Sequence, residues 1–285
     1  MEGFRPGMHT LTIDLDGDPL VADLHVPPAP SSAPPVLLIH GWGGSGRYWR
    51  DTVARLGHRF ALIVPDLPGV GRSLPVRQTR DLFDQVAAVE RLLAALRLER
   101  VHVVGHSMGG GMAIVLAARR PELVDRLVLT SISLFRSDLE RAVFGAVTEV
   151  AGLAMAVRAP WMADVPLLTR QSAARYFYQV PDDPALLRAA FLDYLTMDQA
   201  TAVASARSAS DPAIAAAAAR IRAPTLLVVT REDRLMPAAN VPATVATIPG
   251  CRVRWFERCG HMPMIECADE YAALLEGFLC ESAEC

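Results

Sequence analysis

The sequence contains no lysine, so all 28 of its positively charged residues are arginine. The formal net charge is only −3, and the arginines form no basic tract and no stripe interleaved with aromatic residues. A surface that binds nucleic acid needs a concentration of positive charge. The charge pattern therefore argues against nucleic acid as a partner.

Cysteine is scarce, and five cysteines without a C-x-x-C pair lie in the last 35 residues: Cys251, Cys259, Cys267, Cys280 and Cys285. This odd number and spacing predict neither a disulfide framework nor a zinc site. The N-terminus lacks the apolar run of a secretory signal, and no apolar run reaches the roughly 18 residues of a membrane helix. We therefore expect a cytoplasmic protein that does not insert into a membrane.

Hydrophobic residues are abundant, at 52% of the 285 residues against 21% charged residues. This balance is typical of a compact globular enzyme, and a chain of this length can fold as one α/β domain with an insertion. The sequence shows no internal repeat. Its two low-complexity segments predict a loop at 27–35, rich in proline and serine, and a helix at the alanine tract 215–219.

Short apolar runs alternate with segments of helical period. Residues 11–14 and 20–26 alternate like antiparallel strands, whereas 36–40 is a continuous apolar run, as in a strand buried on both faces. Further strands are expected at 60–65, 101–105, 127–130, 225–230 and 252–256, and helices at 82–96, 108–119, 238–247 and 268–279. This order predicts an α/β fold, with a mostly parallel central sheet flanked by helices.

The alternation is interrupted at residues 133–211, which are rich in alanine, leucine, arginine and aromatic residues and lack strand-like alternation. We expect several short helices here, forming a cap inserted into a core made of 1–132 and 212–285. Such a cap would lie over the carboxyl edge of the sheet, where open α/β sheets bind ligands. Its aromatic residues either pack the cap helices together or line an acyl pocket: Trp161, Phe177, Tyr178, Phe191 and Tyr194.

A G-x-S-x-G segment at residues 105–109 follows one of the expected strands and opens an expected helix. In this context the serine lies at a sharp strand-to-helix turn, and its neighbours must be small because a larger side chain would collide with nearby backbone. The helix N-terminus adds backbone N–H groups and a positive dipole end. The pattern therefore predicts that Ser107 is an exposed nucleophile.

With this turn, the chain resembles the α/β-hydrolase superfamily over almost its whole length. Residues 40–45 (HGWGGS) resemble the family's H-G-x-G loop, and 66–73 (DLPGVGRS) resemble its D-x-x-G-x-G-x-S turn. An acid segment at 230–237 and a histidine segment at 259–263 follow in the family's order. The resemblance implies the α/β-hydrolase fold with a helical cap and chemistry without a metal or organic cofactor.

The resemblance, with the chemistry of acyl transfer, implies roles for the site residues. A serine hydroxyl is a weak nucleophile and needs a base that titrates near neutral pH, which indicates His261 for Ser107. Asp233 would hold the imidazole in the correct tautomer and stabilise its protonated form. The backbone N–H groups of Trp42 and Met108 would form the oxyanion hole.

The acid has two alternatives. Glu232 is a second carboxylate next to Asp233, and Thr230 stands where many relatives have glycine. Asp233 is preferred because its spacing to Pro237 matches the family's acid loop and its side chain is shorter. Asp138 is the more distant alternative. It follows the strand expected at 127–130, and in some relatives the acid comes from that position.

Other polar residues near these motifs are assigned to structure. His106 is expected to point away from the nucleophile and to pack against the sheet. His40 is expected to order the oxyanion loop through hydrogen bonds. Asp66, Gly69 and Gly71 are expected to shape a turn in which glycine permits positive φ.

These residues predict a serine hydrolase that forms an acyl-enzyme, with carboxylic esters of small to medium apolar acids as substrates. The same groups would serve a carbon–carbon bond hydrolase, a lactonase, an acyltransferase or a cofactor-free perhydrolase. Serine at the turn disfavours the haloalkane dehalogenase and epoxide hydrolase branches, which use aspartate there. From another class, a ligand-binding module with vestigial catalysis is the alternative.

Overall fold

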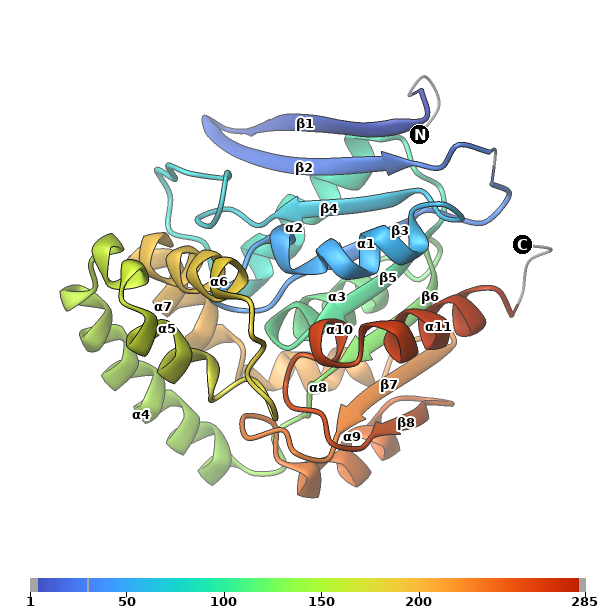
Figure 1. Ribbon diagram of the computed structural model, residues 1–285. Helices are drawn as coiled ribbons and strands as arrows, with labels where there is room; N and C mark the ends of the chain where they lie inside the picture. The colour runs from blue at the N-terminus through green and yellow to red at the C-terminus, as the bar shows by residue number, and fades with distance from the viewer. Residues whose placement is uncertain (1–4, 30, 282–285) are drawn as a thin grey trace.

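In the computed structural model, which describes residues 5–29 and 31–281, eight strands form one sheet in the order β1-β2-β4-β3-β5-β6-β7-β8 (Figure 1). The strands are β1 (Gly7–Leu15), β2 (Asp18–Val26), β3 (Val36–Ile39), β4 (Leu62–Asp66), β5 (Val101–His106), β6 (Val124–Thr130), β7 (Thr225–Thr230) and β8 (Arg252–Phe256). β1 pairs antiparallel with β2 and β2 with β4, and every other neighbouring pair is parallel. The expected α/β fold is confirmed.

Burial explains why the strands differ in sequence. Every residue of β3, β4, β5 and β7 is buried, and most of these residues are apolar, whereas the edge strand β1 alternates between exposed and partly buried residues. β5 lies between β3 and β6, near the middle of the sheet. The residue that follows β5 therefore emerges from the most enclosed part of the fold.

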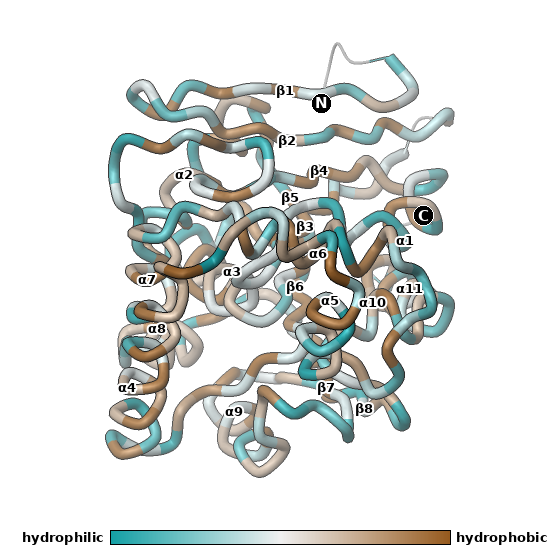
Figure 2. Tube along the Cα trace, turned by 60° about the vertical axis from the view of Figure 1, so that its left-hand side comes forward, coloured by the Kyte–Doolittle hydropathy of each residue, from teal (hydrophilic) through white to brown (hydrophobic). Residues whose placement is uncertain are grey.

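Helices cover both faces of the sheet (Figure 1). One apolar cluster joins the sheet to α2 (Leu82–Ala95), α3 (Met108–Arg119), α8 (Pro212–Ala218) and α9 (Val241–Thr247). The other cluster lies under α1 (Arg50–Leu56), α10 (Pro263–Glu266) and α11 (Ala268–Leu279). In Figure 2 much of the central strands is brown, the hydrophobic colour, while many connecting loops are teal. The two clusters hold the sheet rigid between them.

Three short elements were not expected from the sequence. A 3₁₀ helix at Gly46–Trp49 leads into α1, and α10 is a single turn between the histidine segment and α11. These elements have four, seven and four residues. Elements this short carry too few residues for a helical period to be recognised.

The inserted region lies between β6 and β7 and contains α4 (Asp138–Ala154), α5 (Pro166–Ala173), α6 (Pro184–Thr196) and α7 (Gln199–Ser208), with 3₁₀ turns at Met155–Val157 and Pro160–Asp164. At 17 residues α4 is longer than the short helices expected. Figure 1 shows these helices gathered beyond the carboxyl ends of the parallel strands. No helix within the described ranges is both long and apolar enough to cross a membrane.

Hydrogen bonds connect α7, the last helix of the inserted region, to the core. Leu82 N–H donates to Ser208 Oγ at 2.8 Å, and Ser205 Oγ donates to the carbonyl of Arg80 at 3.0 Å. Asp198 N–H donates to the carbonyl of Gly69 at 2.8 Å. These bonds connect the end of the insertion to α2 and to the D-x-x-G turn.

The cysteines are divided between free and bonded residues. Cys251, Cys259 and Cys267 are free thiols, and Cys280 is disulfide-bonded. Cys285 lies outside the described residues. No group of three or more His, Cys, Asp or Glu side chains in the described part of the chain is arranged to hold a metal ion.

Candidate active site

Ser107 occupies the sharp turn between β5 and α3 that the sequence predicts. Its φ is 54° and its ψ is −122°, a strained backbone conformation that costs about 1–3 kcal/mol and is found mainly at functional sites. A Cβ on Gly105 would lie 2.4 Å from the carbonyl oxygen of Gly109, and one on Gly109 would lie 2.5 Å from that of His40. The two glycines are therefore required by close backbone approach, and the predicted strand-turn-helix geometry is confirmed.

The turn leaves the Ser107 hydroxyl free. Its backbone N–H donates to the carbonyl of Thr130 at 2.9 Å, which anchors the turn to β6. In residues 5–29 and 31–281, neither Ser107 Oγ nor His261 Nε2 forms a hydrogen bond, although both residues line the same cavity. Catalytic pairs are often loosely aligned until a substrate binds.

Asp233 and His261 form a buried pair. Asp233 Oδ2 lies 2.8 Å from His261 Nδ1, and their side chains are only 3% and 2% exposed. The other carboxylate oxygen, Oδ1, accepts hydrogen bonds from the N–H groups of Leu235 at 2.8 Å and Met236 at 3.0 Å. The backbone N–H of His261 donates to the carbonyl of Tyr176 at 2.6 Å. Both side chains are thus held in one orientation.

The two alternative acids lie elsewhere. Glu232 points to the start of the histidine segment, where Oε2 accepts a hydrogen bond from Cys259 N–H at 2.9 Å. The Asp138 side chain is almost fully exposed and pairs with Arg141 on α4. Of the three carboxylates considered, Asp233 is the one that contacts His261.

The carboxylate of Glu266 joins the histidine segment to the inserted region through hydrogen bonds, a role that the sequence analysis does not predict. Its Oε1 accepts from Gly260 N–H at 2.8 Å, and its Oε2 accepts from Tyr178 N–H at 2.8 Å and Gln179 N–H at 3.1 Å. Burial raises the pKa of the Glu266 carboxyl, and the three N–H donors oppose that shift. Glu266, a core residue on α10, therefore links the backbone next to His261 to the backbone of Tyr178 and Gln179 in the inserted region.

The loop that carries Trp42 is ordered as expected. His40 Nδ1 donates to the carbonyl of Gly41 at 2.9 Å and its Nε2 accepts from Leu67 N–H at 3.0 Å, which confirms its structural role. The backbone N–H groups of Trp42 and Met108 make no hydrogen bond within the described residues. The Trp42 indole N–H donates to the carbonyl of Ala202 at 2.9 Å and so joins this loop to α7.

The turn that follows β4 is also structural. Asp66 Oδ1 accepts from Gly46 N–H at 2.8 Å, and its Oδ2 accepts from the N–H and Nε–H of Arg72. These bonds hold the pKa of the Asp66 carboxyl below its usual value, although burial acts in the opposite direction. Gly69 and Gly71 have φ of 91° and 56°, as the sequence predicted.

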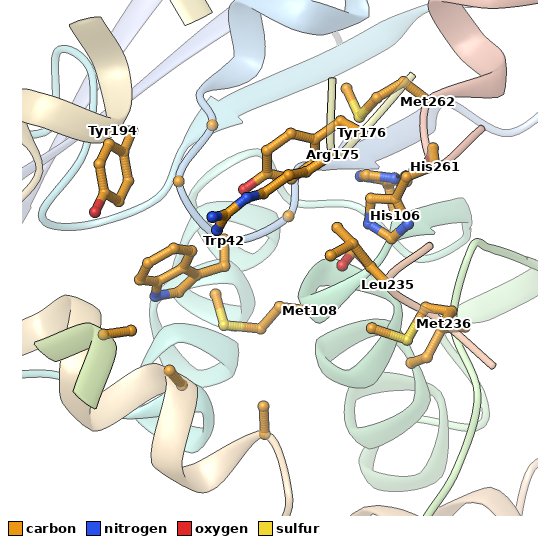
Figure 3. Close-up of a pocket in the computed structure, with 18 of the residues that line it drawn as sticks. Trp42, His106, Met108, Arg175, Tyr176, Tyr194, Leu235, Met236, His261 and Met262 are labelled. Carbon is orange, nitrogen blue, oxygen red and sulfur yellow. Dashed lines mark hydrogen bonds between the residues drawn. The ribbon is translucent and has the colours of Figure 1, made fainter. Parts of the chain in front are cut away.

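A cavity of about 770 Å³ lies between the serine turn and the inserted helices (Figure 3). Its wall is mainly apolar and includes these large side chains: Ile132, Leu134, Phe135, Phe144, Met155, Phe177, Phe191, Tyr194, Ile214, Leu235 and Met236. Of the five cap aromatics considered, Phe177, Phe191 and Tyr194 line the cavity. Trp161 and Tyr178 lie outside it and are 63% and 38% exposed.

The same architecture and chain order occur in known proteins. A family model described as the alpha/beta hydrolase fold matches residues 34–268. The chain belongs to the α/β-hydrolase family. An uncharacterized protein of Mycobacterium tuberculosis is 30% identical over 265 residues, which cover 87% of this chain and 76% of that protein.

Two further relatives of this α/β hydrolase are enzymes by name. The 2-hydroxymuconate semialdehyde hydrolase of Pseudomonas putida is 31% identical over 266 residues, which cover 87% of this chain and 88% of that protein. The crystal structure of a membrane phospholipase A superposes with a TM-score of 0.72 at 27% identity, covering 96% of this chain and 86% of that one.

His106 has neighbours that the sequence analysis did not name. The His106 ring does not pack only against the sheet but lies in the cavity wall, with its centroid 4.7 Å from that of the His261 ring. Its Nε2 is 2.9 Å from the carbonyl oxygen of His261, and its Nδ1 is 3.0 Å from the hydroxyl of Tyr48. Polar partners from two other segments, Tyr48 and the His261 carbonyl, therefore hold the ring beside His261.

Proposed function

We propose that this α/β hydrolase cleaves carboxylic esters of small to medium apolar acids through an acyl-enzyme on Ser107. The observation that carries the proposal is the buried Asp233–His261 pair facing the same cavity as a serine held in a strained turn. Three groups from three segments are thereby available for general-base-assisted nucleophilic attack.

In the first half of the reaction, Ser107 Oγ bonds to the carbonyl carbon while His261 Nε2 takes the hydroxyl proton. The tetrahedral intermediate collapses, the ester C–O bond breaks, and His261 returns the proton to the departing alkoxide. In the second half, water attacks the acyl-serine and His261 takes the water proton. The bond between the acyl carbon and Ser107 Oγ then breaks, His261 returns the proton to Oγ, and the carboxylic acid leaves. The Asp233 carboxylate stabilises the imidazolium in both halves.

The negative charge of the tetrahedral intermediate would develop near Met108 N–H, at the start of α3, and near Trp42 N–H. The N-terminus of the 12-residue helix α3 adds a favourable dipole. Removing one such donor typically costs about 10²–10³ in rate. The position of the Trp42 loop therefore matters as much as that of the base.

The size and lining of the cavity favour a substrate with an apolar acyl group. Its volume of about 770 Å³ lies within the range of sites that enclose small-molecule ligands, and its wall consists mostly of aliphatic and aromatic side chains. Each buried methylene of an acyl chain contributes roughly 0.8 kcal/mol. We therefore expect kcat/KM to rise along a series of esters until the acyl chain fills the cavity.

The test uses a fluorophosphonate probe together with p-nitrophenyl esters of increasing acyl length. The expected result is labelling of the native protein, loss of labelling in Ser107→Ala, and turnover that depends on acyl length. Retention of a ligand without labelling or turnover would instead indicate a binding module.

A second candidate is hydrolysis of an acyl compound that carries an anionic group, including cleavage of a carbon–carbon bond next to a carbonyl. Arg175 favours it, because its side chain extends into the cavity on the side of Trp42 and forms no ion pair with any described residue (Figure 3). By contrast, Arg47 pairs with Asp193 at 3.5 Å. The 31% identity to the semialdehyde hydrolase of Pseudomonas putida points to the same candidate.

The two candidates are separated by paired substrates, the monoester and the diester of one dicarboxylic acid. If Arg175 holds an anion, Arg175→Gln raises KM for the monoester by roughly 10- to 100-fold, as expected for a lost charge-assisted hydrogen bond, and leaves KM for the diester unchanged. Equal effects on both substrates would rule out the anionic-substrate candidate and leave the apolar ester.

A further inference from the structure

A series of hydrogen bonds, part-buried at Tyr48 and buried at His106, connects the Trp42 loop to the residue proposed as the base. The backbone N–H of Gly41 donates to the hydroxyl of Tyr48. That hydroxyl lies 3.0 Å from His106 Nδ1, and His106 Nε2 lies 2.9 Å from the carbonyl oxygen of His261. Gly41 immediately precedes Trp42, so the series starts beside one proposed oxyanion donor and ends on the residue proposed as the base.

The chemistry of these groups allows one arrangement of protons. A carbonyl oxygen can only accept, so His106 Nε2 must carry the hydrogen that is donated to His261. In a neutral imidazole Nδ1 is then an acceptor, and the Tyr48 hydroxyl must donate to it. The same hydroxyl oxygen accepts from Gly41 N–H. Every link therefore has one donor and one acceptor.

The surroundings keep both side chains neutral. Burial, together with the neighbouring His261, holds the pKa of the His106 imidazole well below its usual value. Burial likewise raises the pKa of the Tyr48 hydroxyl well above its usual value. The proton arrangement is therefore the same across the pH range in which the enzyme would work.

Close packing limits how far the hydrogen-bonded groups of Gly41, Tyr48 and His106 can shift. A Cβ on Gly44 would lie 2.6 Å from Cε1 of the Tyr48 ring, so the ring is pressed against the Trp42 loop. The rings of Tyr48 and His106 meet edge to face, at 87° and with 5.5 Å between centroids. A Cβ on Gly41 would lie 3.0 Å from Cβ of Ser107. Loop, nucleophile and ring are in mutual contact.

We propose that Tyr48 is a positioning residue that, through Gly41 N–H and His106, fixes the separation between the oxyanion loop and the His261 segment. The inference rests on the proposed function, because the position of Trp42 N–H relative to the base matters only if both act on one acyl group. Tyr48 contributes no proton to the reaction. Its effect is on alignment, to which catalytic rates are steeply sensitive.

The decisive variant is Tyr48→Phe, which removes only the hydroxyl. We expect kcat for a p-nitrophenyl ester to fall about 10- to 100-fold, as for a misplacement of the order of 1 Å. KM should change by less than about twofold, since the apolar wall that binds the acyl group remains. The rate of fluorophosphonate labelling should fall by a factor similar to that of kcat.

Tyr271→Phe is the matched control. The Tyr271 hydroxyl is buried and hydrogen-bonded, 2.8 Å from Thr130 Oγ1, and its ring stacks on Trp49. Among the described residues Tyr271 forms no side-chain hydrogen bond with the Trp42 loop, and it does not line the cavity. Its removal should lower the melting temperature as Tyr48→Phe does, and leave kcat within about twofold of native. An equal loss of kcat in the control would overturn the proposal by assigning the effect to general loosening.

A second substitution, which breaks the same series of hydrogen bonds at another residue, makes the test independent of how well one variant folds. In His106→Gln the amide nitrogen can still donate to the carbonyl of His261 but offers Tyr48 no acceptor at the position of Nδ1. If the series acts as a unit, the double variant Tyr48→Phe/His106→Gln loses little more kcat than the more affected single variant. Multiplicative losses, or native kcat in Tyr48→Phe, would refute the positioning role, whereas absence of labelling in the native protein would refute the proposed function itself.

Discussion

The Ser45 hydroxyl donates a 2.6 Å hydrogen bond to Oδ2 of Asp193, although 148 residues separate the two in the chain. Ser45 ends the glycine-rich loop of the core, and Asp193 lies on α6 of the inserted region. Arg47 adds an ion pair of 3.5 Å to the same carboxylate. One buried carboxylate therefore holds the cap against the loop that carries Trp42.

Replacing this carboxylate should loosen the cap. We expect Asp193→Ala to lower the free energy of unfolding by about 1–3 kcal/mol, because the buried Ser45 hydroxyl loses its acceptor. KM for an ester should rise, since both α6 and the glycine loop line the cavity. Urea denaturation and steady-state kinetics measure the two effects.

Two variants control for this effect. Asp193→Asn keeps an acceptor for Ser45 and should recover most of the stability. Asp182→Ala removes a carboxylate that is 99% exposed and should change the free energy of unfolding by less than about 0.5 kcal/mol. Equal losses in Asp193→Ala and Asp182→Ala would contradict the role of the Ser45–Asp193 bond.

The adjacent carboxylates Asp233 and Glu232 give a matched pair of substitutions. Asp233→Asn removes the charge that stabilises the imidazolium and permits the wrong tautomer of His261, so kcat should fall about 10³- to 10⁴-fold. Glu232→Gln keeps an oxygen that can accept from Cys259 N–H, and kcat should stay within about threefold of native. The reverse order of effects would make Glu232 the acid.

Sequence alone could place Ser107, Asp233 and His261 because each lies in a local motif directly after a strand, where residue type and turn geometry are linked. Tyr48, Asp193 and Glu266 could not be found in that way. They act across 58, 148 and 88 residues of chain, on His106, Ser45 and Tyr178 respectively. Their residue types are common and no neighbouring pattern marks them, so only folding reveals their partners.

Local sequence patterns were also insufficient for the inserted region and for His106, where contacts between distant segments decide the structure. A helical composition predicted helices at 133–211, but the length of α4 and the attachment of α7 to α2 depend on tertiary contacts. The direction of the His106 ring depends on Tyr48 and on the His261 carbonyl. Local rules therefore predicted the sheet, the turns and the places of Ser107, Asp233 and His261 after their strands, and left the contacts between segments open.

Gly109 and Gly277 offer a second matched pair. A Cβ on Gly109 would lie 2.5 Å from the carbonyl oxygens of both Ile39 and His40, which are backbone atoms held in place by the sheet and the loop. Gly109→Ala should therefore destabilise the protein by about 1–3 kcal/mol, as overpacking does, and displace the Trp42 loop. Thermal unfolding and ester turnover should both decline.

Gly277 lies inside α11, and apart from its chain neighbours and the adjacent backbone of its own helix no described atom lies within 4 Å of its potential Cβ. Gly277→Ala should raise the free energy of unfolding by about 0.5–1 kcal/mol, because alanine is the better helix former. Turnover should be native. If Gly109→Ala were as stable and active as Gly277→Ala, the close approach of backbone at the serine turn would be contradicted.

His102 on β5 should make the protein sensitive to acid. Its ring is fully buried, and neither ring nitrogen forms a hydrogen bond within the described residues, although Nδ1 lies 3.3 Å from Oδ2 of Asp125, which also pairs with Arg100. Burial, together with Arg126 and Arg100, lowers the pKa of the imidazole to about 4. In the unfolded chain the imidazole titrates near 6.5. Between pH 6.5 and 4 the unfolded state therefore binds the extra proton, and stability must fall as the pH is lowered through this window.

His102→Leu removes the titrating group from this core position, together with its 3.3 Å contact to Asp125. We expect the slope of unfolding free energy against pH, between 6.5 and 4, to become shallower by up to about 1.4 kcal/mol per pH unit. His58→Gln, on an exposed residue, is the control and should leave the slope unchanged. Because burial also lowers the pKa of His40 and His106, a reduced acid sensitivity should remain in His102→Leu. An unaltered slope, measured by urea denaturation at intervals of half a pH unit, would show that His102 is not the dominant acid-sensitive group of the core.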